Sequence, residues 1–382
     1  MANILKNLHI IVRCFYLYLI QGKADKTLSS PKSIIIIQRA KLGDMISTTP
    51  MFRAVKKVYP ECRVIVVGNS INKKVLEGNP DVDEYIVWND DVSEMVKIFK
   101  ERKPDFGCTT SPNFHSLAAL YLSGIKSISA PIILGGWSPY ETRSYKIIRR
   151  FVIAKGHRMR HYVPLENLKL LEPLGIFETN TKKYIYWSKE AEIKINQFLS
   201  EIGTEQAMLV GVMPGAGNKI KQWPPERFSQ IVDYLVEKYK AKVLIIGGET
   251  NRKEIEEMSS KVRNKESLVD CSWSSIDELK ALIPRLDMTV SVDTGPIFIA
   301  EASDVPTIDI AGAIHPSEMA PNDDNFHLIV QSKGEPQIWT MNARVYDYEE
   351  ARKQIESITV SMVMEKVDEL MEKIRSRAGT SS

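Results

Sequence analysis

One short segment, from Asp293 to Pro296, has side chains and a backbone suited to holding a phosphate beside a sugar. It follows the apolar run 286–292, which reads as a buried strand, and precedes a helix-like segment from Ile297. A helix N-terminus presents unpaired N–H groups and roughly half a positive charge. Thr294 adds a hydroxyl, Gly295 admits a ligand close to the backbone, and Asp293 suits hydroxyl groups next to a phosphate. The alternative is structural, with Asp293 or Thr294 capping the helix.

A second strand-to-helix turn carries Asp44, directly after Gly43. The β-branched run 33–38 predicts a strand buried on both faces, and a helix is expected from about 44 to 59. At the end of such a strand Asp44 could act as a general base that takes a proton from a hydroxyl nucleophile. Asp is also among the best helix-capping residues, and the two roles do not exclude each other.

A glycine-rich loop after the strand expected at 208–213 contains Pro214, Gly215 and Ala216. Its backbone amides could bind a phosphate, and Lys219 and Lys221 could add positive charge. The order of residues is not that of a P-loop. The alternative is a surface loop with solvated lysines.

Two further acidic positions are weaker candidates. Glu249 ends the next strand, where it could bind ribose hydroxyls or simply face solvent or cap a helix. Asp81-Val82-Asp83 matches a metal-binding DxD pattern, but it follows Gly78-Asn79-Pro80 and a turn is the better interpretation. The four cysteines include no CxxC pair, and we identify no metal site.

The composition describes an ordinary soluble protein of two domains. The chain has 382 residues, of which 43% are hydrophobic and 26% charged, and its net charge of +3 gives no argument for nucleic acid. Basic residues cluster without any acidic residue between them, at Arg143, Lys146, Arg149, Arg150, Lys155, Arg158 and Arg160. Such a cluster could bind an anionic saccharide, a membrane surface or only water.

Residues 1–30 form a separate extension. Ile4, Leu8, Ile11, Phe15 and Leu19 recur at spacings of three and four, which predicts an amphipathic helix. The segment is short and interrupted for a membrane-spanning helix, and its polar continuation argues against a signal peptide. The helix is expected either to lie on a membrane surface or to pack on the protein.

Strand and helix patterns alternate in two series. The first predicts strands at 33–38, 63–67, 84–87 and 105–109 with helices between them, and it weakens between 135 and 175. A linker is expected at about 182–206. The second predicts strands at 208–213, 242–246, 288–292 and 307–310, and a long helix over 348–375. We therefore expect an α/β protein with Rossmann-like domains at 31–185 and 205–345, a cleft between them, and a closing helix at 346–376.

Three motifs together resemble glycosyltransferase family 9, the ADP-heptose:lipopolysaccharide heptosyltransferases. The motifs are Arg39-x-x-Leu42-Gly43-Asp44-x₅-Pro50, Pro214-Gly215-Ala216 with Lys221-x-Trp223-Pro224, and Ser291-x-Asp293-Thr294-Gly295-Pro296. The resemblance implies a GT-B fold and a metal-independent, inverting transfer with no cofactor beyond the nucleotide-sugar donor, ADP-heptose. It implies that the first domain binds the acceptor and the second binds the donor.

The resemblance also implies roles for single residues. Asp44 would be the catalytic base, and Asp293 would contact the donor sugar. Lys221 and the backbone amide groups at Thr294, Gly295 and Pro296 would hold the diphosphate. The remaining donor contacts would come from Pro214, Gly215, Ala216 and Glu249, and the acceptor contacts from Arg143, Arg149, Arg150, Arg158 and Arg160.

Some residues depart from the family pattern around the donor. Phe298 stands where heptosyltransferases tend to carry a histidine, and Gly312-Ala313-Ile314-His315-Pro316 replaces their Gly-Pro-Thr-Asp-Pro loop. A transferase that uses another nucleotide sugar, and a non-catalytic nucleotide-sugar-binding relative, are therefore alternatives. If the protein is a heptosyltransferase, a lipid-linked or anionic saccharide acceptor places it in the cytoplasm, at the inner face of the inner membrane.

Overall fold

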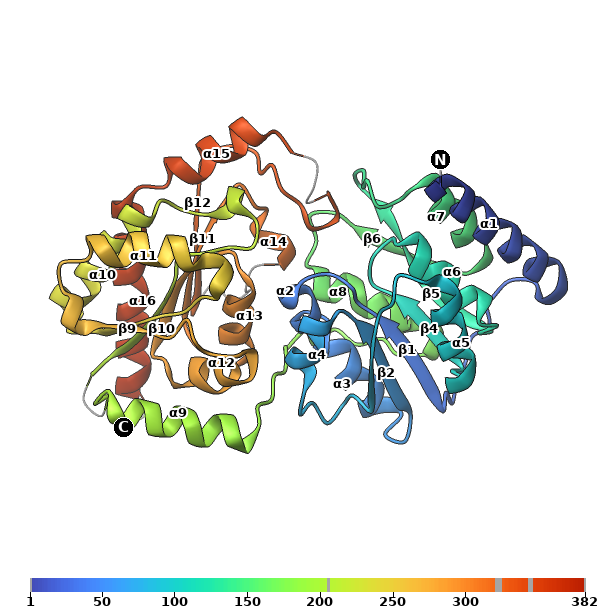
Figure 1. Cartoon of the computed structure of the whole chain (residues 1–382), viewed down its shortest axis with the longest axis horizontal. Helices are drawn as coiled ribbons and strands as arrows, with labels where there is room; N and C mark the ends of the chain where they lie inside the picture. The colour runs from blue at the N-terminus through green and yellow to red at the C-terminus, as the bar shows by residue number, and fades with distance from the viewer. Residues whose placement is uncertain (1, 205–206, 320–324, 343–345, 381–382) are drawn as a thin grey trace. The chain divides into compact units, whose positions relative to one another are not determined.

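The computed structural model describes residues 2–204, 207–319, 325–342 and 346–380. The chain divides into two compact units, which we treat separately. Unit 1 comprises residues 1–183 with 340–344, and unit 2 comprises 184–339 with 345–382. Each unit is built around a parallel sheet with helices on its faces (Figure 1).

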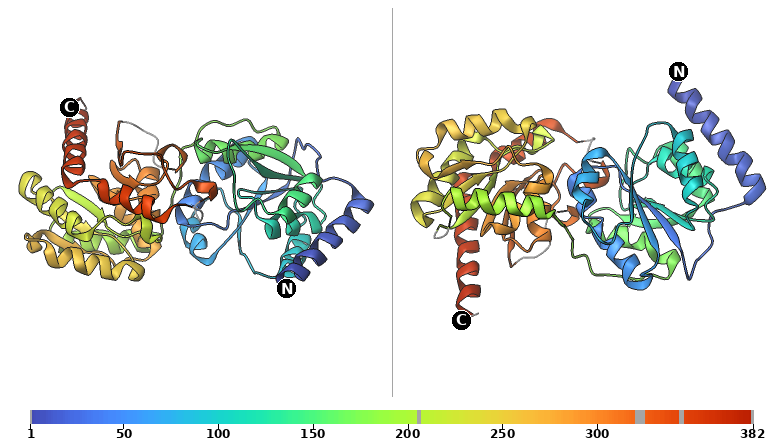
Figure 2. Two further views of the ribbon diagram at one scale, coloured as in Figure 1. Left: turned by 90° about the horizontal axis from the view of Figure 1, so that it is seen from above. Right: turned by 60° about the horizontal axis from the view of Figure 1, so that its bottom comes forward.

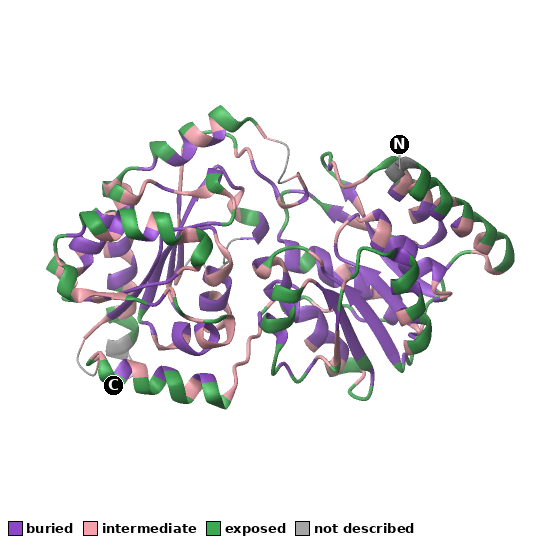
Figure 3. Ribbon diagram, viewed as in Figure 1, coloured by how far each residue is buried: buried purple, intermediate pink, exposed green. Residues whose placement is uncertain are grey.

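The sheet of unit 1 has the strand order β3-β2-β1-β4-β5-β6, and every neighbouring pair is parallel. Its strands are β1 Ser33–Ile37, β2 Arg63–Gly68, β3 Glu84–Val87, β4 Phe106–Thr109, β5 Ser127–Leu134 and β6 Ile153–Arg158. Strand β1 is buried along its whole length, as its β-branched run predicts (Figure 3). Strands β5 and β6 were not among the predicted strands, and β6 lies within the stretch where the alternation weakens.

The helices of unit 1 are α1 Ala2–Gln21, α2 Leu42–Ile46, α3 Thr49–Val58, α4 Ser70–Leu76, α5 Val92–Arg102, α6 Phe114–Leu122, α7 Arg143–Ile148 and α8 Val163–Leu168, with 3₁₀ turns η1 Arg149–Phe151 and η2 Lys169–Leu174. Helices α5, α6 and α7 contribute to one core with the strands. Helix α1 packs on the outside of α6 and α7 (Figure 2).

The amphipathic helix predicted within residues 1–30 is present as α1, but its packing face matches the predicted apolar stripe only in part, since Ile11 of the stripe packs against the core of unit 1. Ile10 and Cys14 are buried in the core of unit 1, whereas Leu8 and Leu19 of the predicted stripe are exposed. Helix α1 contacts its unit along one side only, so few of its side chains are buried. Within the part of the chain that the structure describes, no helix has the length and apolar character needed to cross a membrane.

The sheet of unit 2 has the order β12-β11-β10-β7-β8-β9 and is also parallel. Its strands are β7 Leu209–Met213, β8 Lys242–Ile245, β9 Leu268–Asp270, β10 Met288–Val292, β11 Thr307–Gly312 and β12 His327–Gln331. The predicted strands at 208–213, 242–246, 288–292 and 307–310 are confirmed, and β9 and β12 are additional.

The helices of unit 2 are α9 Lys189–Glu201, α10 Pro225–Tyr239, α11 Arg252–Lys261, α12 Ile276–Leu282, α13 Gly295–Ala302, α14 Pro316–Met319, α15 Tyr348–Ser357 and α16 Val360–Thr380. Short 3₁₀ turns include η3 Lys219–Lys221 and η4 Glu249–Asn251. Helices α10, α11 and α16 share one core with the central strands.

Three predictions, two of helices and one of a linker, need correction. The helix expected over 44–59 is two helices, because Thr48 Oγ1 donates to the carbonyl of Asp44 and Pro50, the second residue of the second helix, has no N–H. The helix expected over 348–375 is also two. It breaks at Ile358, whose carbonyl accepts the Trp223 indole N–H at 2.9 Å.

The third correction concerns the linker expected at 182–206, which contains α9. Ser188 caps this helix by accepting the Ala191 N–H, and Ile195 packs inward from it. The exposed residues of α9 are mostly polar, with Ile193 an exception, so the average composition of the segment resembles that of a linker.

Candidate active site

Both sheets reverse their strand order at one point, and the predicted site residues follow the strands on either side of it. In unit 1 the reversal lies between β1 and β4, and Asp44 follows β1. In unit 2 it lies between β7 and β10, and these strands lead to Lys221 and Asp293. Ligands of open α/β sheets bind at the carboxyl ends of strands beside such a reversal. Each unit therefore places its candidate residues at the position where its fold can form a site.

Asp44 lies in the first turn of α2, three residues after the N-cap residue Lys41. Its Oδ2 accepts the backbone N–H of Lys41 at 3.1 Å, and the residue is half-buried. Asp44 therefore does cap α2, as the capping interpretation predicts, but it does so from the third position of the helix and not from the N-cap position. This bond fixes the side chain without burying it, and a half-buried carboxylate on a fixed turn has the access that a general base requires.

Side chains from neighbouring loops hold the turn that carries Asp44. The amides of Asn69 and Asn72 both donate to the carbonyl of Ala40, at 2.8 and 2.9 Å. Gln38 Oε1 accepts the Ala40 N–H at 3.0 Å, and Gln38 is buried. These positioning residues were missed from the sequence, although Asn69 stands at a helix N-cap, where an Asn is easily noticed.

Arg39 crosses the strand reversal of unit 1. Its guanidinium lies 4.1 Å from the centre of the Trp88 ring and within 3.3 Å of the Asn113 side-chain oxygen. Burial lowers the pKa of Arg39, and the nearby Asp90 carboxylate opposes that effect. The guanidinium thus ties the loop after β1 to the loop after β4.

In unit 2 the ammonium of Lys221 forms an ion pair with the carboxylate of Asp293. Lys221 ends η3 after β7, and Asp293 directly follows β10. The Lys221 side chain is 22% exposed and the Asp293 side chain is 9% exposed, so the pair is largely buried but still accessible to solvent. It brings together a cation suited to a phosphate and an acceptor suited to sugar hydroxyls.

The N-terminus of α13 lies directly after this pair. Thr294 is the N-cap residue, but its side chain makes no capping hydrogen bond, and Asp293 pairs with Lys221. The purely structural capping interpretation is therefore wrong for both side chains. Pro296 has no N–H, so of the three amide groups predicted to hold a diphosphate only those of Thr294 and Gly295 can donate.

The glycine-rich loop passes very close to the loop after β8. A Cβ built on Gly215 would lie 2.4 Å from Cγ of Asn251, so only glycine fits there without a shift. Ala216 is buried, and its carbonyl accepts the Gln222 amide at 3.3 Å. Glu249, by contrast, is exposed and pairs with Arg252 at 2.7 Å. That contact agrees with the solvent-facing alternative for Glu249.

Asp309 is a buried carboxyl that the sequence interpretation missed. It lies on β11 opposite Ser291 in the register with β10, and it is 1% exposed. Neither side-chain oxygen has a hydrogen-bond partner in the described structure. Burial raises its pKa well above the usual value, and the Asp293 carboxylate raises it further. The signal in the sequence is a single acid within the apolar run Thr307–Ile310.

The basic stretch does not form one surface. Arg149 and Arg150 lie in η1, before β6 begins, whereas Arg158 ends β6 and Arg160 follows it. Six strand residues separate the two groups by about 20 Å. The second group lies at the sheet edge where β1 leads to Asp44.

The positive charge of the first group, Arg149 and Arg150, is also partly neutralised. Arg149 forms an ion pair with Glu141, just outside the stretch. Arg143 starts α7 and is exposed. Arg158 and Arg160 therefore lie at the sheet edge of Asp44, whereas Arg149 and Arg150 do not.

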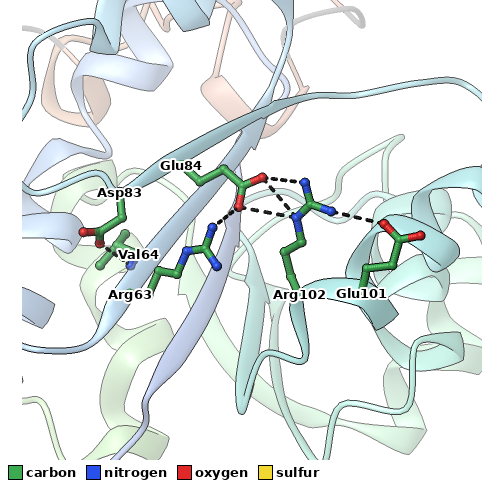
Figure 4. Close-up of polar contacts among 6 residues, drawn as sticks. All are labelled: Arg63, Val64, Asp83, Glu84, Glu101 and Arg102. Carbon is green, nitrogen blue, oxygen red and sulfur yellow. Dashed lines mark hydrogen bonds and ion pairs between the residues drawn. The ribbon is translucent and has the colours of Figure 1, made fainter.

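The DxD pattern is part of a turn, as predicted. Asp81 pairs with Arg53 at 2.6 Å, and Asp83 accepts the Val64 N–H at 2.7 Å. Beside it, Glu84 bridges two arginines (Figure 4). These residues lie where β2 and β3 begin, at the edge opposite Asp44. Among the residues that the structure describes, no group of three or more His, Cys, Asp or Glu side chains is arranged to hold a metal ion.

Comparison with known proteins agrees with the family resemblance, and the second and third motifs lie within the matched residues. Residues 139–342 match the model of glycosyltransferase family 9 (heptosyltransferase). Lipopolysaccharide heptosyltransferase 3 of Escherichia coli K12 is 23% identical over 280 residues, which cover 71% of this chain and 80% of that protein.

Two solved structures share the fold. A family 9 glycosyl transferase from Veillonella parvula superposes with a TM-score of 0.70 at 18% identity, covering 89% of this chain and 98% of that one. ADP-heptose lps heptosyltransferase II of E. coli gives 0.69 at 15% identity, covering 91% and 99%. The GT-B fold with two Rossmann-like units is thereby confirmed. The chain belongs to glycosyltransferase family 9, the heptosyltransferase family, and is a glycosyltransferase.

Proposed function

We propose that the protein transfers a heptose from ADP-heptose to an anionic, lipid-linked saccharide of the lipopolysaccharide core, with inversion at the anomeric carbon and without a metal ion. The observation that carries the proposal is the Lys221–Asp293 pair beside the N-terminus of α13. Family membership and the names of the similar heptosyltransferases support heptose as the sugar.

In the proposed donor complex the ion pair exchanges partners. The Lys221 ammonium turns to the diphosphate, where the N–H groups of Thr294 and Gly295 also donate. The Asp293 carboxylate accepts hydrogen bonds from the sugar hydroxyls. Fixed donors of this kind stabilise the negative charge that the leaving nucleoside diphosphate gains. Pro214, Gly215 and Ala216 shape the wall on the β7 side, and Glu249 could reach the ribose if it leaves Arg252.

Asp44 is the proposed base for the acceptor. Its carboxylate takes the proton of an acceptor hydroxyl as the oxygen forms a bond to the anomeric carbon. The bond from that carbon to the diphosphate oxygen breaks, and its electron pair leaves with the nucleoside diphosphate. Attack opposite the leaving group inverts the configuration. Such a base contributes roughly 10²–10⁴-fold to the rate.

Arg158 and Arg160 are the proposed acceptor contacts, because they lie at the same sheet edge as Asp44. Both side chains are exposed, and guanidinium groups bind phosphate and carboxylate in two-point geometry. Arg143, at the start of α7, could extend this surface. A lipid-linked acceptor would bring the protein to the cytoplasmic face of the inner membrane.

A second candidate is a family 9 transfer from another nucleotide sugar. Phe298 is buried in α13 and offers no polar group at a position where family members tend to have a histidine. His315 stacks on Trp339 with ring centres 4.2 Å apart. Both residues follow strands that border the proposed donor site, so they can change which sugar fits.

The test is donor binding by calorimetry with ADP-, GDP-, UDP- and CDP-linked sugars, followed by product analysis with a core saccharide acceptor. We expect binding and turnover with ADP-heptose and an inverted anomeric configuration in the product. Turnover with another donor would select the second candidate. Binding without turnover on any acceptor would indicate a non-catalytic relative.

A further inference from the structure

Helix α1 has two apolar faces, and the structure uses only one of them. Ile10 and Cys14 lie in the core of unit 1, with Tyr18 packed along the same side. On the other side, Leu8 is 54% exposed and Leu19 is 82% exposed. One helix thus packs against its unit and still presents an apolar surface outward.

The outward face is continuous along α1. It consists of residues at helical spacings of three and four, namely Leu5, Leu8, Val12, Phe15, Tyr16 and Leu19. Each is exposed, and α1 contains no acidic residue. Figure 3 shows most of the helix surface as exposed. Soluble monomers rarely expose a large contiguous apolar patch, and such patches mark interaction sites.

A groove lies at the end of α1, next to this face. It has a volume of about 590 Å³, with an apolar wall that includes Tyr18, Ile132, Phe151, Val152 and Ala154. The Phe151 ring stacks on Tyr18 at 4.6 Å between centres and meets the edge of Phe15 at 5.2 Å. Since Phe15 belongs to the outward face, the helix surface and the groove are continuous.

The groove is basic. Lys23, Arg149 and Arg150 line it, and Arg149 is neutralised by Glu141. The side chains of Lys23 and Arg150 form no ion pair with any described residue and are exposed. On α1 itself Lys6 is exposed, whereas Arg13 is half-buried and donates a hydrogen bond to Ser93 Oγ at 3.1 Å. The positive charge therefore accompanies the apolar surface from one end of the helix to the other.

We propose that the outward face of α1 and the Lys23–Arg150 groove bind the surface of a bilayer that contains anionic phospholipids. The apolar side chains enter the boundary between headgroups and acyl chains, and the groove receives a lipid phosphate. An amphipathic helix with basic flanks binds membranes in this orientation. The inference deepens the proposed function, because it names the surface that would bring this transferase to a lipid-linked acceptor.

The first test removes apolar surface and keeps charge. The full chain is sedimented with vesicles of phosphatidylglycerol and phosphatidylcholine, as wild type and as Leu8→Gln/Leu19→Gln. We expect binding of this variant to weaken by at least about tenfold, because two apolar side chains no longer enter the bilayer. The matched control is Phe177→Gln/Ile193→Gln, whose side chains are 79% and 58% exposed elsewhere. An equal loss in the control, or no loss in either, would overturn the proposal.

The second test removes charge from the groove. Lys23→Gln/Arg150→Gln should bind phosphatidylglycerol vesicles roughly 25-fold more weakly, since each of the two basic side chains near such a surface contributes about 1 kcal/mol, or about fivefold. The control Lys73→Gln/Lys100→Gln has the same net charge and should bind like wild type. Equal binding of both variants would refute the groove's role. Sedimentation of wild type with pure phosphatidylcholine should be weak.

A further measurement distinguishes a lipid surface from a second copy of the chain as the occupant of the outward face. A dimer seen by analytical ultracentrifugation without vesicles, and dissociated by Leu8→Gln/Leu19→Gln, would identify a second copy as the occupant and overturn the lipid assignment.

Donor binding by the Leu8→Gln/Leu19→Gln variant should equal that of wild type, because the donor residues lie in unit 2. Vesicle binding without any donor binding would refute the proposed function and leave this inference standing.

Discussion

Lys221 and Asp293 form an ion pair across 72 residues of sequence, from loops that follow the two strands at the reversal of the second sheet. The pair brings opposite charges to the N-terminus of α13, where a free carboxylate alone would repel a phosphate. Each partner holds the other in place, and each has a chemical group that a sugar diphosphate could bind instead.

Replacing Lys221 with Met should weaken donor binding by roughly tenfold or more, because one charge-assisted hydrogen bond contributes about 1.5–3 kcal/mol. Calorimetric titration with the donor measures this. Lys219→Met is the matched control, since Lys219 lies in the same 3₁₀ turn and is exposed.

The Lys221 variant leaves the nearly buried Asp293 without its partner, so its stability should fall. The double variant Lys221→Met/Asp293→Asn removes both charges and should recover stability but not donor affinity. An unchanged donor Kd in Lys221→Met would show that this lysine does not contact the donor.

Asp44→Asn should lower kcat by about 10²–10⁴-fold and leave the donor Kd unchanged. The amide oxygen of Asn can still accept the Lys41 N–H, so the turn is expected to stay in place. Turnover with a saccharide acceptor and calorimetry with the donor give the two numbers. Near wild-type turnover would contradict the assignment of Asp44 as the base.

Gly215→Ala should destabilise unit 2 and weaken donor binding, because the new Cβ would overlap the side chain of Asn251. The matched variant Gly215→Ala/Asn251→Gly removes the overlapping atoms. It should regain most of the lost melting temperature in differential scanning fluorimetry. If Gly215→Ala alone melts like wild type, the close approach of these two loops is not needed for folding.

Asp309→Asn should stabilise the protein at neutral pH. Burial and the Asp293 carboxylate raise the pKa of Asp309 in the folded chain well above its usual value of 3.8, so the folded chain holds this proton to a higher pH than the unfolded chain does. The unfolded state therefore binds fewer protons, and wild-type stability falls as the pH rises above that value. Each pKa unit of the rise corresponds to about 1.4 kcal/mol.

The measurement is the difference in free energy of unfolding between Asp309→Asn and wild type, taken from pH 4 to pH 8. The advantage of the variant should grow with pH and be smallest at pH 4. A difference that does not change with pH would show that Asp309 ionises normally in the folded protein.

The alternating strand and helix patterns were sufficient to predict two parallel α/β units. A continuous β-branched run such as the one within 33–37 is typical of a parallel strand, because both faces of such a strand must be buried. The predictions missed β5, which is almost wholly buried but contains Pro131, and β6, and they failed where a side chain interrupts a helix. Strand β6 reads Ile-Ala-Lys-Gly-His-Arg, and its pattern of buried and exposed residues is irregular.

By itself, the sequence determined the chemistry available at the strand ends. Asp44, Lys221 and Asp293 each follow an apolar run and precede a helix, and parallel strands must bring such turns to one edge of their sheet. Local patterns contain that information, since they depend on residues close in sequence.

Only the tertiary structure decided which groups meet. It paired Lys221 with Asp293, placed Asp309 opposite Ser291, and separated Arg150 from Arg158 by the length of β6. It also decided which side of α1 packs inward. These outcomes depend on contacts between residues far apart in sequence, because strand order and register, rather than local spacing, determine which side chains become neighbours.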